Sequence, residues 1–294
     1  MNLSEYLAGR RERIEAELDR LAPAATTPPE TLHRAMRYSL FAGGKRLRPI
    51  LCLEAGRAAA DYAPGIERAA CSLELVHTYS LIHDDLPALD NDDFRRGRPT
   101  CHREFGEAVA MLAGDALLTL AFQALAELEG VPDTGKALLV AELARAAGSV
   151  GGMIGGQMAD LEGVNATPTA ELLERIHRAK TGALLTASVR MGAICAGASL
   201  GQLEALTRYG RHVGLAFQIV DDILDVEEPS QALGKTAGKD AQQGKITFPA
   251  VYGLAESHRM AEEEAARACA AVESFGERAG RLWELAEYIV RRKK

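Results

Sequence analysis

Two groups of aspartates stand far apart in this chain, and basic residues follow each of them. The first group lies in residues 84–90, shortly before Arg95 and Arg96, and the second lies in residues 221–225. Clustered carboxylates repel one another and raise one another's pKa values, so such a cluster is costly without a counterion. Mg²⁺ prefers oxygen ligands and usually also takes the phosphate oxygens of a substrate. The combination therefore predicts a site that holds a diphosphate group through Mg²⁺.

The second group has the spacing of one helix face. Asp221 and Asp225 are four residues apart, so they lie one turn apart on the same side of a helix. Asp222 stands between them, and Ile223 and Leu224 make the intervening positions apolar. A solvated acidic helix face is the ordinary explanation of a charge run. The apolar neighbours instead place these acids beside a hydrophobic seam, which favours carboxylates that share one cation or bridge two.

The first group ends a helical pattern. Asp84 and Asp85 close the pattern, Pro87 interrupts it, and Asp90 comes from the following turn. Negative charge at a helix C-terminus is unfavourable without a cation, which is a second argument for a bound metal. An EF-hand is excluded, because the segment lacks the turn glycine and the closing glutamate of that motif.

Cationic residues supply the groups that would grip phosphate oxygens. Residues 43–49 read Gly-Gly-Lys-Arg-Leu-Arg-Pro, and an arginine fork binds paired phosphate oxygens where a lysine acts as a point charge. Taken alone, this segment and the Arg95-Arg96 pair are equally compatible with ordinary cationic loops. The segment 234–236, Gly-Lys-Thr, has the ending of a P-loop, but no glycine stands five residues earlier and no strand precedes it. A nucleotide site is therefore not supported.

Three polar residues stand inside apolar patterns. His77 precedes Asp84 on the same predicted helix, and Lys180 and Thr181 begin an apolar segment. A lone histidine on a helix is usually packed or capped, whereas beside metal-bound phosphates it would donate a hydrogen bond. The Lys-Thr pair is either an ordinary polar helix position or a pair aimed into a cavity.

Composition bounds the class of protein. The chain has 294 residues, of which 47% are apolar and 26% charged, as in soluble globular proteins. Its net charge of −7 argues against a nucleic-acid binder. The five cysteines include no CxxC pair, which fits core packing in a reducing compartment. No signal-peptide pattern opens the sequence, and Arg190 interrupts the most apolar stretch, so we expect no membrane span and a cytoplasmic location.

Helical spacing of apolar residues recurs along the chain, and no run of alternating β-branched residues predicts a strand. We therefore predict one all-α domain over residues 1–294, a bundle of roughly ten to twelve helices of ~10–25 residues each. In the glycine-rich residues 148–156, Met153 and Met158 keep a helical period, which favours a closely packed helix over a loop. The predicted breaks between helices are residues 23–29, 42–48, 61–65, 87–99, 130–135, 163–168, 197–201 and 227–244.

Together and in this order, these segments resemble the trans-isoprenyl diphosphate synthases, and most closely the bacterial farnesyl diphosphate synthases (geranyltranstransferases). The resemblance implies a single polyprenyl synthase domain, an all-α bundle with a central active-site cavity, and a homodimer. The matching segments are GGKRLRP (43–49), LVHTYSLIHDDLPALDNDDFRRGRPTCH (75–102), GGQMADL (155–161), RIHRAKTGALL (175–185), FQIVDDILD (217–225), LGKTAGKD (233–240), GKITFPA (244–250) and YIV (288–290).

The resemblance also implies roles for individual residues. Isopentenyl diphosphate would be held by Lys45, Arg48, His77 and Arg96. The allylic diphosphate would meet Arg95, Lys180, Lys235 and Lys245. The principal Mg²⁺ ligands would be Asp84, Asp90 and Asp221, with direct or water-mediated support from Asp85, Asp222 and Asp225. The residues closest to the reacting groups would be Arg95, Lys180, Thr181 and Gln218.

The implied reaction is a prenyl transfer. Three Mg²⁺ ions, with Mn²⁺ as the alternative, and the cationic side chains make the allylic diphosphate a good leaving group. Its C–O bond breaks to an allylic cation, the isopentenyl double bond attacks that cation, and a proton is lost to the released pyrophosphate. Water must be excluded, because it would quench the cation. Oxygens of Thr181, Gln218 and the Lys180 backbone would stabilise the positive charge.

Product length depends on the helix that precedes Asp84. Tyr79 and Ser80 stand about one turn before Asp84 on that helix, or ~6–8 Å along its axis. An aromatic ring at this depth would close the pocket for the growing hydrocarbon tail, whereas Ser80 is too small to do so. The resemblance links a large residue here with a C15 product, so we predict mainly farnesyl diphosphate. Geranylgeranyl or geranyl diphosphate is the alternative product.

Other functions are less consistent with the sequence. A class I terpene cyclase would mix Asn, Ser and Glu in its second metal motif and would not need the isopentenyl clamp. A non-catalytic subunit of a synthase heterodimer would lose aspartates, and both groups are intact here. A head-to-head synthase of the squalene type commonly carries a membrane anchor. The sequence leaves open whether the basic tail, residues 291–294, covers the site or is frayed.

Overall fold

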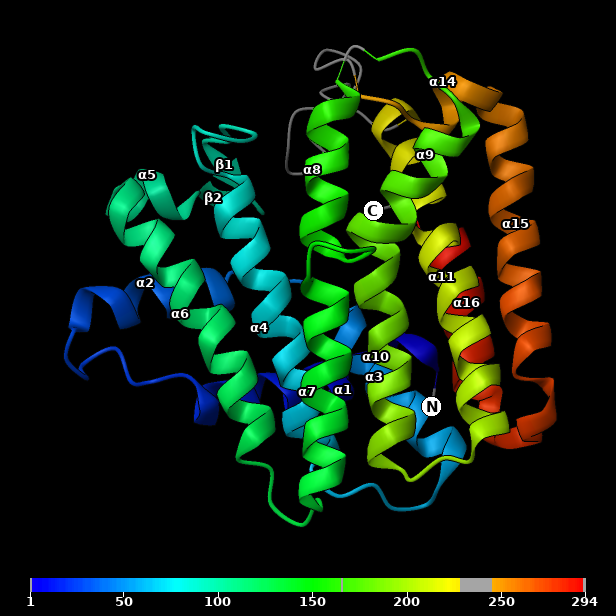
Figure 1. The fold of residues 1–294 in the computed structure, drawn as a ribbon, viewed down its shortest axis with the longest axis horizontal. Coiled ribbons are helices and arrows are strands. Elements are labelled where there is room, and N and C mark those ends of the chain that lie inside the picture. The colour runs from blue at the N-terminus through cyan, green and yellow to red at the C-terminus, as the bar shows by residue number, and fades with distance from the viewer. Residues whose placement is uncertain (1, 165, 228–244, 293–294) are drawn as a thin grey trace. The chain divides into compact units, whose positions relative to one another are not determined.

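The computed structural model describes residues 2–164, 166–227 and 245–292. Helices account for almost all regular structure in these ranges, which confirms the predicted all-α class (Figure 1). The chain packs into two compact units. The first comprises Met1–Ile50 and Gly65–Val140, and the second comprises Leu51–Pro64 and Ala141–Lys294.

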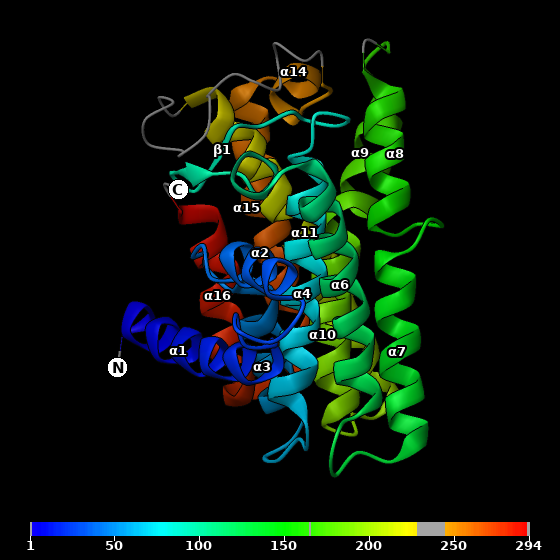
Figure 2. The ribbon, with the colours of Figure 1, turned by 90° about the vertical axis from the view of Figure 1, so that its left-hand side faces the viewer.

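The first unit is built around α4. None of its residues is fully exposed, and Leu73, Leu75 and Val76 are inaccessible to solvent, as expected for a helix with neighbours on most sides. It packs along α6, which lies beside it in Figures 1 and 2. The helices of this unit are α1 (Leu3–Leu21), α2 (Glu30–Leu40), α4 (Ile66–Asp84), α5 (Cys101–Phe105) and α6 (Glu107–Ala126), with the first residues of α3 (Leu47–Ala59) and of α7 (Asp133–Ala147).

A short hairpin interrupts the helices of the first unit. Strands β1 (Phe94–Arg95) and β2 (Arg98–Pro99) are antiparallel. Arg96, at φ 53°, and Gly97, at φ 75°, adopt the left-handed conformation that a two-residue type I′ turn requires at both positions. The prediction of no strands was therefore wrong at this point, because two-residue strands are too short to show alternation.

Helix α6 is unusually apolar for a helix with an exposed side. In the part of the chain that the structure describes, it is the one helix long and apolar enough to cross a membrane, and 39% of its apolar window is buried. Buried helices of soluble proteins pass the same test. The exposed side carries Met111 and Leu112, which are 52% and 57% exposed. In the stretch 183–200, which the sequence marked as most apolar, the buried residues all lie in residues 183–195.

The second unit is built around the long helix α11. It packs against α10, α15 and α16 (Figure 2). The π-helical turn η1 joins α9 to α10, and the residues on either side of it have helical backbone angles. The elements of this unit are α8 (Met153–Gly163), α9 (Ala170–His177), η1 (Arg178–Gly182), α10 (Ala183–Cys195), α11 (Leu200–Glu227), α14 (Phe248–Tyr252), α15 (Leu254–Ala271), the 3₁₀ helix η2 (Glu273–Ala279) and α16 (Gly280–Arg291).

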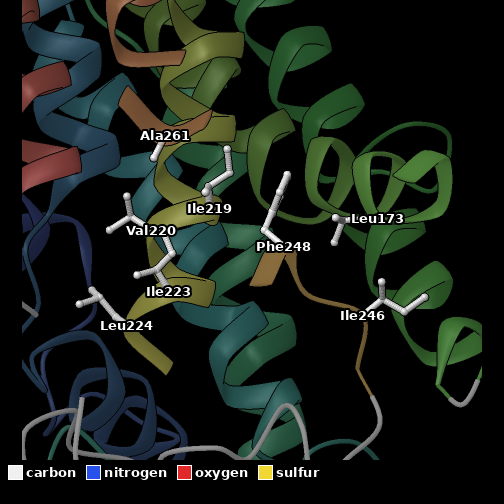
Figure 3. Packing of buried hydrophobic residues seen from close by; sticks show 8 residues of the cluster. All are labelled: Leu173, Ile219, Val220, Ile223, Leu224, Ile246, Phe248 and Ala261. Carbon is white, nitrogen blue, oxygen red and sulfur yellow. The ribbon is translucent and has the colours of Figure 1, made fainter. Parts of the chain in front are cut away.

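A hydrophobic cluster supports the aspartate-bearing end of α11 (Figure 3). Ile219, Ile223 and Leu224 of this helix pack with Phe248 of α14 and Ala261 of α15. The apolar residues that the sequence placed between the aspartates are thus core residues. They fix the rotation of α11 and hence the side on which each aspartate lies.

The glycine-rich residues 148–156 were predicted as one helix, and this was wrong for the first half. Helix α7 ends at Ala147 and α8 begins at Met153, with Gly151 at φ 66° in the connection. The close packing expected of the glycines is present in α8. A Cβ at Gly156 would lie 2.1 Å from the backbone nitrogen of Lys180. The helix can therefore approach η1 only because residue 156 has no side chain.

Candidate active site

The first aspartate group lies where the chain folds back over the C-terminal end of α4. The backbone N–H of Asp90 donates to the carbonyl oxygen of Asp84 at 2.8 Å, and those of Asn91 and Asp92 donate to Leu86 and Asp85 at 3.1 and 3.2 Å. These bonds satisfy carbonyls that a helix end leaves without intrahelical partners. They also hold Asp84 and Asp90, the two expected principal ligands of this group, side by side.

Asp85 is buried and is bound by Arg95. The Arg95 Nε atom lies 2.9 Å from both carboxylate oxygens, and its Nη2 atom lies 2.6 Å from Oδ1. Burial raises the pKa of the Asp85 carboxyl, and the hydrogen bonds from Arg95 oppose that shift. The hairpin turn carries Arg95 to this position. Asp85 therefore orients Arg95, a contact that differs from the support of Mg²⁺ expected of this residue and leaves that expectation untested.

The four residues expected to hold isopentenyl diphosphate belong to the first unit. Arg96 donates to the carbonyl oxygen of Gly43, on the loop that continues into Lys45 and Arg48. A Cβ at Gly44 would lie 2.8 Å from the Arg96 guanidinium, and Gly44 has φ 132°, so glycine is required there. Burial lowers the pKa of His77, and the charges of Arg48 and Arg96 lower it further. The structure thus gathers a cationic group around a neutral histidine.

The sequence indicated Arg46 only as a member of the cationic segment 43–49, but the structure shows that its side chain stabilises the fold. Its side chain is buried, with Nη1 2.8 Å from Glu74 Oε1 of α4 and Nη2 2.7 Å from the carbonyl oxygen of Leu40. The backbone of Arg46 has φ 51°, a conformation uncommon for a residue with a side chain. The buried ion pair anchors the loop that carries Lys45 and Arg48. No pattern in the sequence separates this arginine from its neighbours.

In the second unit, a chain of hydrogen bonds links Thr181, Gln218 and Asp222. Thr181 Oγ1 donates to Gln218 Oε1 at 2.8 Å, and Gln218 Nε2 donates to Asp222 Oδ1 at 2.9 Å. The other oxygen of Asp222 accepts the backbone N–H of Phe248 at 2.9 Å. The structure therefore brings Thr181 and Gln218 together. The two hydrogen bonds fix the orientation of the Asp222 carboxylate, and each oxygen keeps a further lone pair.

Asp225 offers an oxygen that fits a metal ligand. The residue is 6% exposed, and its Oδ1 atom is buried without a hydrogen-bond partner. A buried carboxylate oxygen in this state is costly unless a cation binds it. Among the described residues, no three His, Cys, Asp or Glu side chains converge on one metal position.

Lys180 lies in η1 and pairs with Asp160 of α8. The Nζ atom of Lys180 is 2.7 Å from Asp160 Oδ2, and the carboxylate is largely shielded from solvent. Single π-helical turns occur often at functional sites. No role was predicted for Asp160, although it lies in the segment 155–161 that carries part of the family resemblance. Its place in that segment, five residues after Gly155, is the one indication that the sequence offers.

The structure describes only one of the two remaining lysines that were expected at the allylic diphosphate. Lys245 is half-buried just before α14. Lys235 lies outside the described residues, as does most of the predicted break 227–244.

The residues expected to limit product length lie on α4. Tyr79 is 5% exposed, and its hydroxyl is buried without a hydrogen-bond partner. Burial, and then the charge of Asp84, raises the pKa of Tyr79 to about 12. Ser80 is half-buried, and its hydroxyl donates to the carbonyl oxygen of His77 at 2.9 Å. Tyr79 is thus a buried aromatic residue near enough to Asp84 for the charge of Asp84 to raise its pKa. The two residues lie on the same helix, as the spacing predicted.

The basic tail contacts the second aspartate group. The side chain of Arg292 is 5% exposed, and its Nη2 atom lies 3.3 Å from Asp221 Oδ1 and 3.0 Å from the carbonyl oxygen of Phe217. Its guanidinium also lies over the Phe217 ring, 3.9 Å from the centroid. Asp221 is 46% exposed, so it remains accessible to a cation. Arg292 is therefore an additional residue of this site that the sequence left open.

We expect Arg292→Ala to tighten the binding of Mn²⁺ in the presence of pyrophosphate. Arg292 and a metal ion compete for the same carboxylate, and a half-exposed ion pair is worth about 0.5–1 kcal/mol, or roughly 2- to 5-fold in affinity. Electron paramagnetic resonance of free Mn²⁺ would measure the change. Arg291→Ala is the matched control, because Arg291 is 79% exposed and pairs with Glu287. Unchanged Mn²⁺ affinity in Arg292→Ala would contradict the competition.

The described helices define an all-α protein, and comparison with known proteins identifies its family. A family model described as polyprenyl synthetase matches residues 29–279. The chain is 48% identical over 258 residues to a farnesyl diphosphate synthase of Geobacillus stearothermophilus, covering 87% of this chain and 86% of that protein. It is 45% identical over 296 residues to a geranylgeranyl diphosphate synthase of Cyanophora paradoxa, covering 99% and 97%.

A solved structure shows the same fold. The crystal structure of a geranyltransferase from Legionella pneumophila matches with a TM-score of 0.88 and 35% sequence identity, covering 99% of this chain and 96% of that one. The chain belongs to the polyprenyl synthetase family. It is a prenyltransferase with the all-α isoprenoid synthase fold, as the sequence predicted.

Proposed function

We propose that this chain condenses isopentenyl diphosphate head-to-tail with an allylic diphosphate and makes mainly farnesyl diphosphate and pyrophosphate. The observation that carries the proposal is the group of Arg48, Arg96 and His77 in the first unit. This cationic group would hold a second diphosphate, in addition to the one that we propose is held through metal. A cyclase, which uses a single allylic diphosphate, has no need of such a group.

The metal requirement is part of the same proposal. Asp84, Asp90 and Asp221 would be the principal ligands of Mg²⁺, and the buried Oδ1 atom of Asp225 fits a further ligand. Bound Mg²⁺ would neutralise the diphosphate and make it a better leaving group. Three ions with substrate bound is the number that the family resemblance implies, with Mn²⁺ as the alternative ion.

The side chains of the protein would position the substrates and shield the reacting carbons. Arg95, fixed by Asp85, and Lys180, fixed by Asp160, would bind oxygens of the allylic diphosphate. Thr181 donates its proton to Gln218, so the lone pairs of its oxygen remain available to face positive charge on carbon. No base activates the Thr181 hydroxyl or the Gln218 amide oxygen, so neither oxygen is a strong nucleophile toward the allylic cation.

The C15 product is the finer part of the proposal. Its support is Tyr79, a buried aromatic ring about one turn from Asp84. The relatives include both farnesyl and geranylgeranyl diphosphate synthases, so C20 is the second candidate product.

Product analysis tests both the reaction and its product length. The purified chain would be incubated with isopentenyl diphosphate and each of three primers, the dimethylallyl, geranyl and farnesyl diphosphates. Farnesyl diphosphate should accumulate from the first two primers, and the third should react poorly. Tyr79→Ala should shift the products to C20. Hydrocarbon formed from geranyl diphosphate alone would indicate a cyclase, and an inactive purified chain would favour the subunit of a heterodimer.

The proposed assembly is a homodimer that uses the exposed side of α6. Met111 and Leu112 form an apolar surface there that a second copy would cover. We expect Leu112→Glu to produce monomers, because a buried unpaired carboxylate is costly at an interface. Light scattering after size exclusion would measure the mass. Leu200→Glu is the control, since Leu200 is 81% exposed on another helix. A dimer that survives Leu112→Glu would place the interface elsewhere.

A cytoplasmic location also stays a prediction. It rests on the cysteine content, which fits a reducing compartment. Cell fractionation with an antibody against the chain would test it.

A further inference from the structure

Tyr79 is held in place by packing rather than by a hydrogen bond. Its buried hydroxyl has no hydrogen-bond partner. Its ring contacts the imidazole of His83, one helical turn later on α4, with ring centroids 5.7 Å apart and planes at 76°. This edge-to-face arrangement is a favourable one for aromatic rings. The position of the tyrosine ring therefore depends on the position of the imidazole.

His83 is in turn fixed to α6. Its Nε2 atom lies 3.0 Å from the carbonyl oxygen of Met111. A carbonyl oxygen can only accept, so Nε2 carries the proton and donates it. The carboxylate of Asp115, one turn further along α6, lies 3.9 Å from the same nitrogen. Both groups on α6 favour one orientation of the imidazole.

Gly114 provides the space that the imidazole occupies. A Cβ at this position would lie 2.2 Å from His83 Nε2 and 2.5 Å from its Cδ2 atom. Gly114 lies inside α6, where glycine is less favourable than alanine. Its backbone is not in the left-handed region, so the conformation does not require glycine. The close approach of His83 is therefore the physical reason for glycine at 114.

We infer that His83, seated against Gly114, is a positioning residue that holds the Tyr79 ring in place and so sets product length. The inference deepens the proposed function and rests on it. The imidazole contacts both the tyrosine ring and α6. Without it, the ring can move toward the vacated space, and the pocket that the ring closes becomes deeper. His83 itself need not touch the substrate.

Product ratios of four variants test the inference, with geranyl and isopentenyl diphosphates as substrates. His83→Ala should raise the ratio of C20 to C15 product by roughly fivefold or more. His83→Gln should stay near the wild-type ratio, because its amide can still donate to the Met111 carbonyl oxygen and fills much of the space. Gly114→Ala should also loosen the C15 limit, since the new methyl group displaces the imidazole. The double variant should match His83→Ala alone, because the clash needs the imidazole.

The readout separates positioning from mere stability. The ratio is measured on the molecules that turn over, so partial unfolding lowers the yield without changing it. A wild-type ratio in an active His83→Ala variant would overturn the inference. So would a double variant whose ratio is the product of the two single effects. If the wild-type chain forms no prenyl product from the two substrates, the proposed function fails instead.

Discussion

Asp225→Asn is expected to lower kcat by about 10²- to 10³-fold while the protein stays folded, the range found when one electrostatic contact to a transition state is removed. Asp225 is buried, and its Oδ1 atom receives no hydrogen bond. The amide keeps the shape of the carboxyl group but removes the charge that a cation needs. Steady-state kinetics at saturating Mg²⁺ would measure kcat. Mn²⁺ affinity in the presence of pyrophosphate would report the loss of the ligand directly.

Asp222→Asn is the informative contrast to this variant. Asp222 accepts from the Phe248 N–H and from Gln218, so an amide nitrogen would face a donor. An unsatisfied buried donor costs about 1–3 kcal/mol, so the free energy of unfolding should fall by that amount. Glu227→Gln, on the exposed end of α11, should change neither quantity. Wild-type kcat and Mn²⁺ affinity in Asp225→Asn would show that Asp225 binds no metal.

Arg46→Met is expected to reduce the free energy of unfolding by about 3–5 kcal/mol, the cost of leaving a buried charge without its partner. The charge left behind is that of Glu74, which has 3% of its side chain exposed. The loop that carries Lys45 and Arg48 should lose its anchor at the same time. We therefore expect KM for isopentenyl diphosphate to rise more than KM for the allylic substrate. Urea unfolding and initial rates would measure the two effects.

A double variant separates the effect of losing the ion pair from the effect of changing the size of the side chain. Arg46→Met with Glu74→Leu removes both charges, and replacing a buried ion pair by apolar residues is often neutral. The double variant should recover most of the lost stability. It should keep the raised KM, because the hydrogen bond to the Leu40 carbonyl is still missing. A single variant within 1 kcal/mol of wild type would contradict the buried-charge argument.

Much of the fold was readable from local patterns. The helical period of Ile219, Ile223 and Leu224 predicted the seam that the structure shows as a buried cluster. Most predicted breaks fall between helices, because clusters of proline and glycine disfavour helix. The connection at residues 148–152 was missed, since Met153 and Met158, which follow it, keep a helical period. The hairpin of β1 and β2 was not predicted because its strands are only two residues long.

In the candidate site, too, some features followed from local sequence patterns and others depended on tertiary packing. The sequence by itself determined the two aspartate groups, the cationic segments and the helical phase of Tyr79 relative to Asp84, because residue type and spacing within one element fix these. Only the tertiary structure decided how individual groups are used. Asp222 accepts from a residue 26 positions away, Arg46 pairs across 28 and Arg292 contacts a carbonyl 75 positions away. Periodicity reports which face of a helix is apolar, whereas a hydrogen-bond partner from another element depends on how the helices pack.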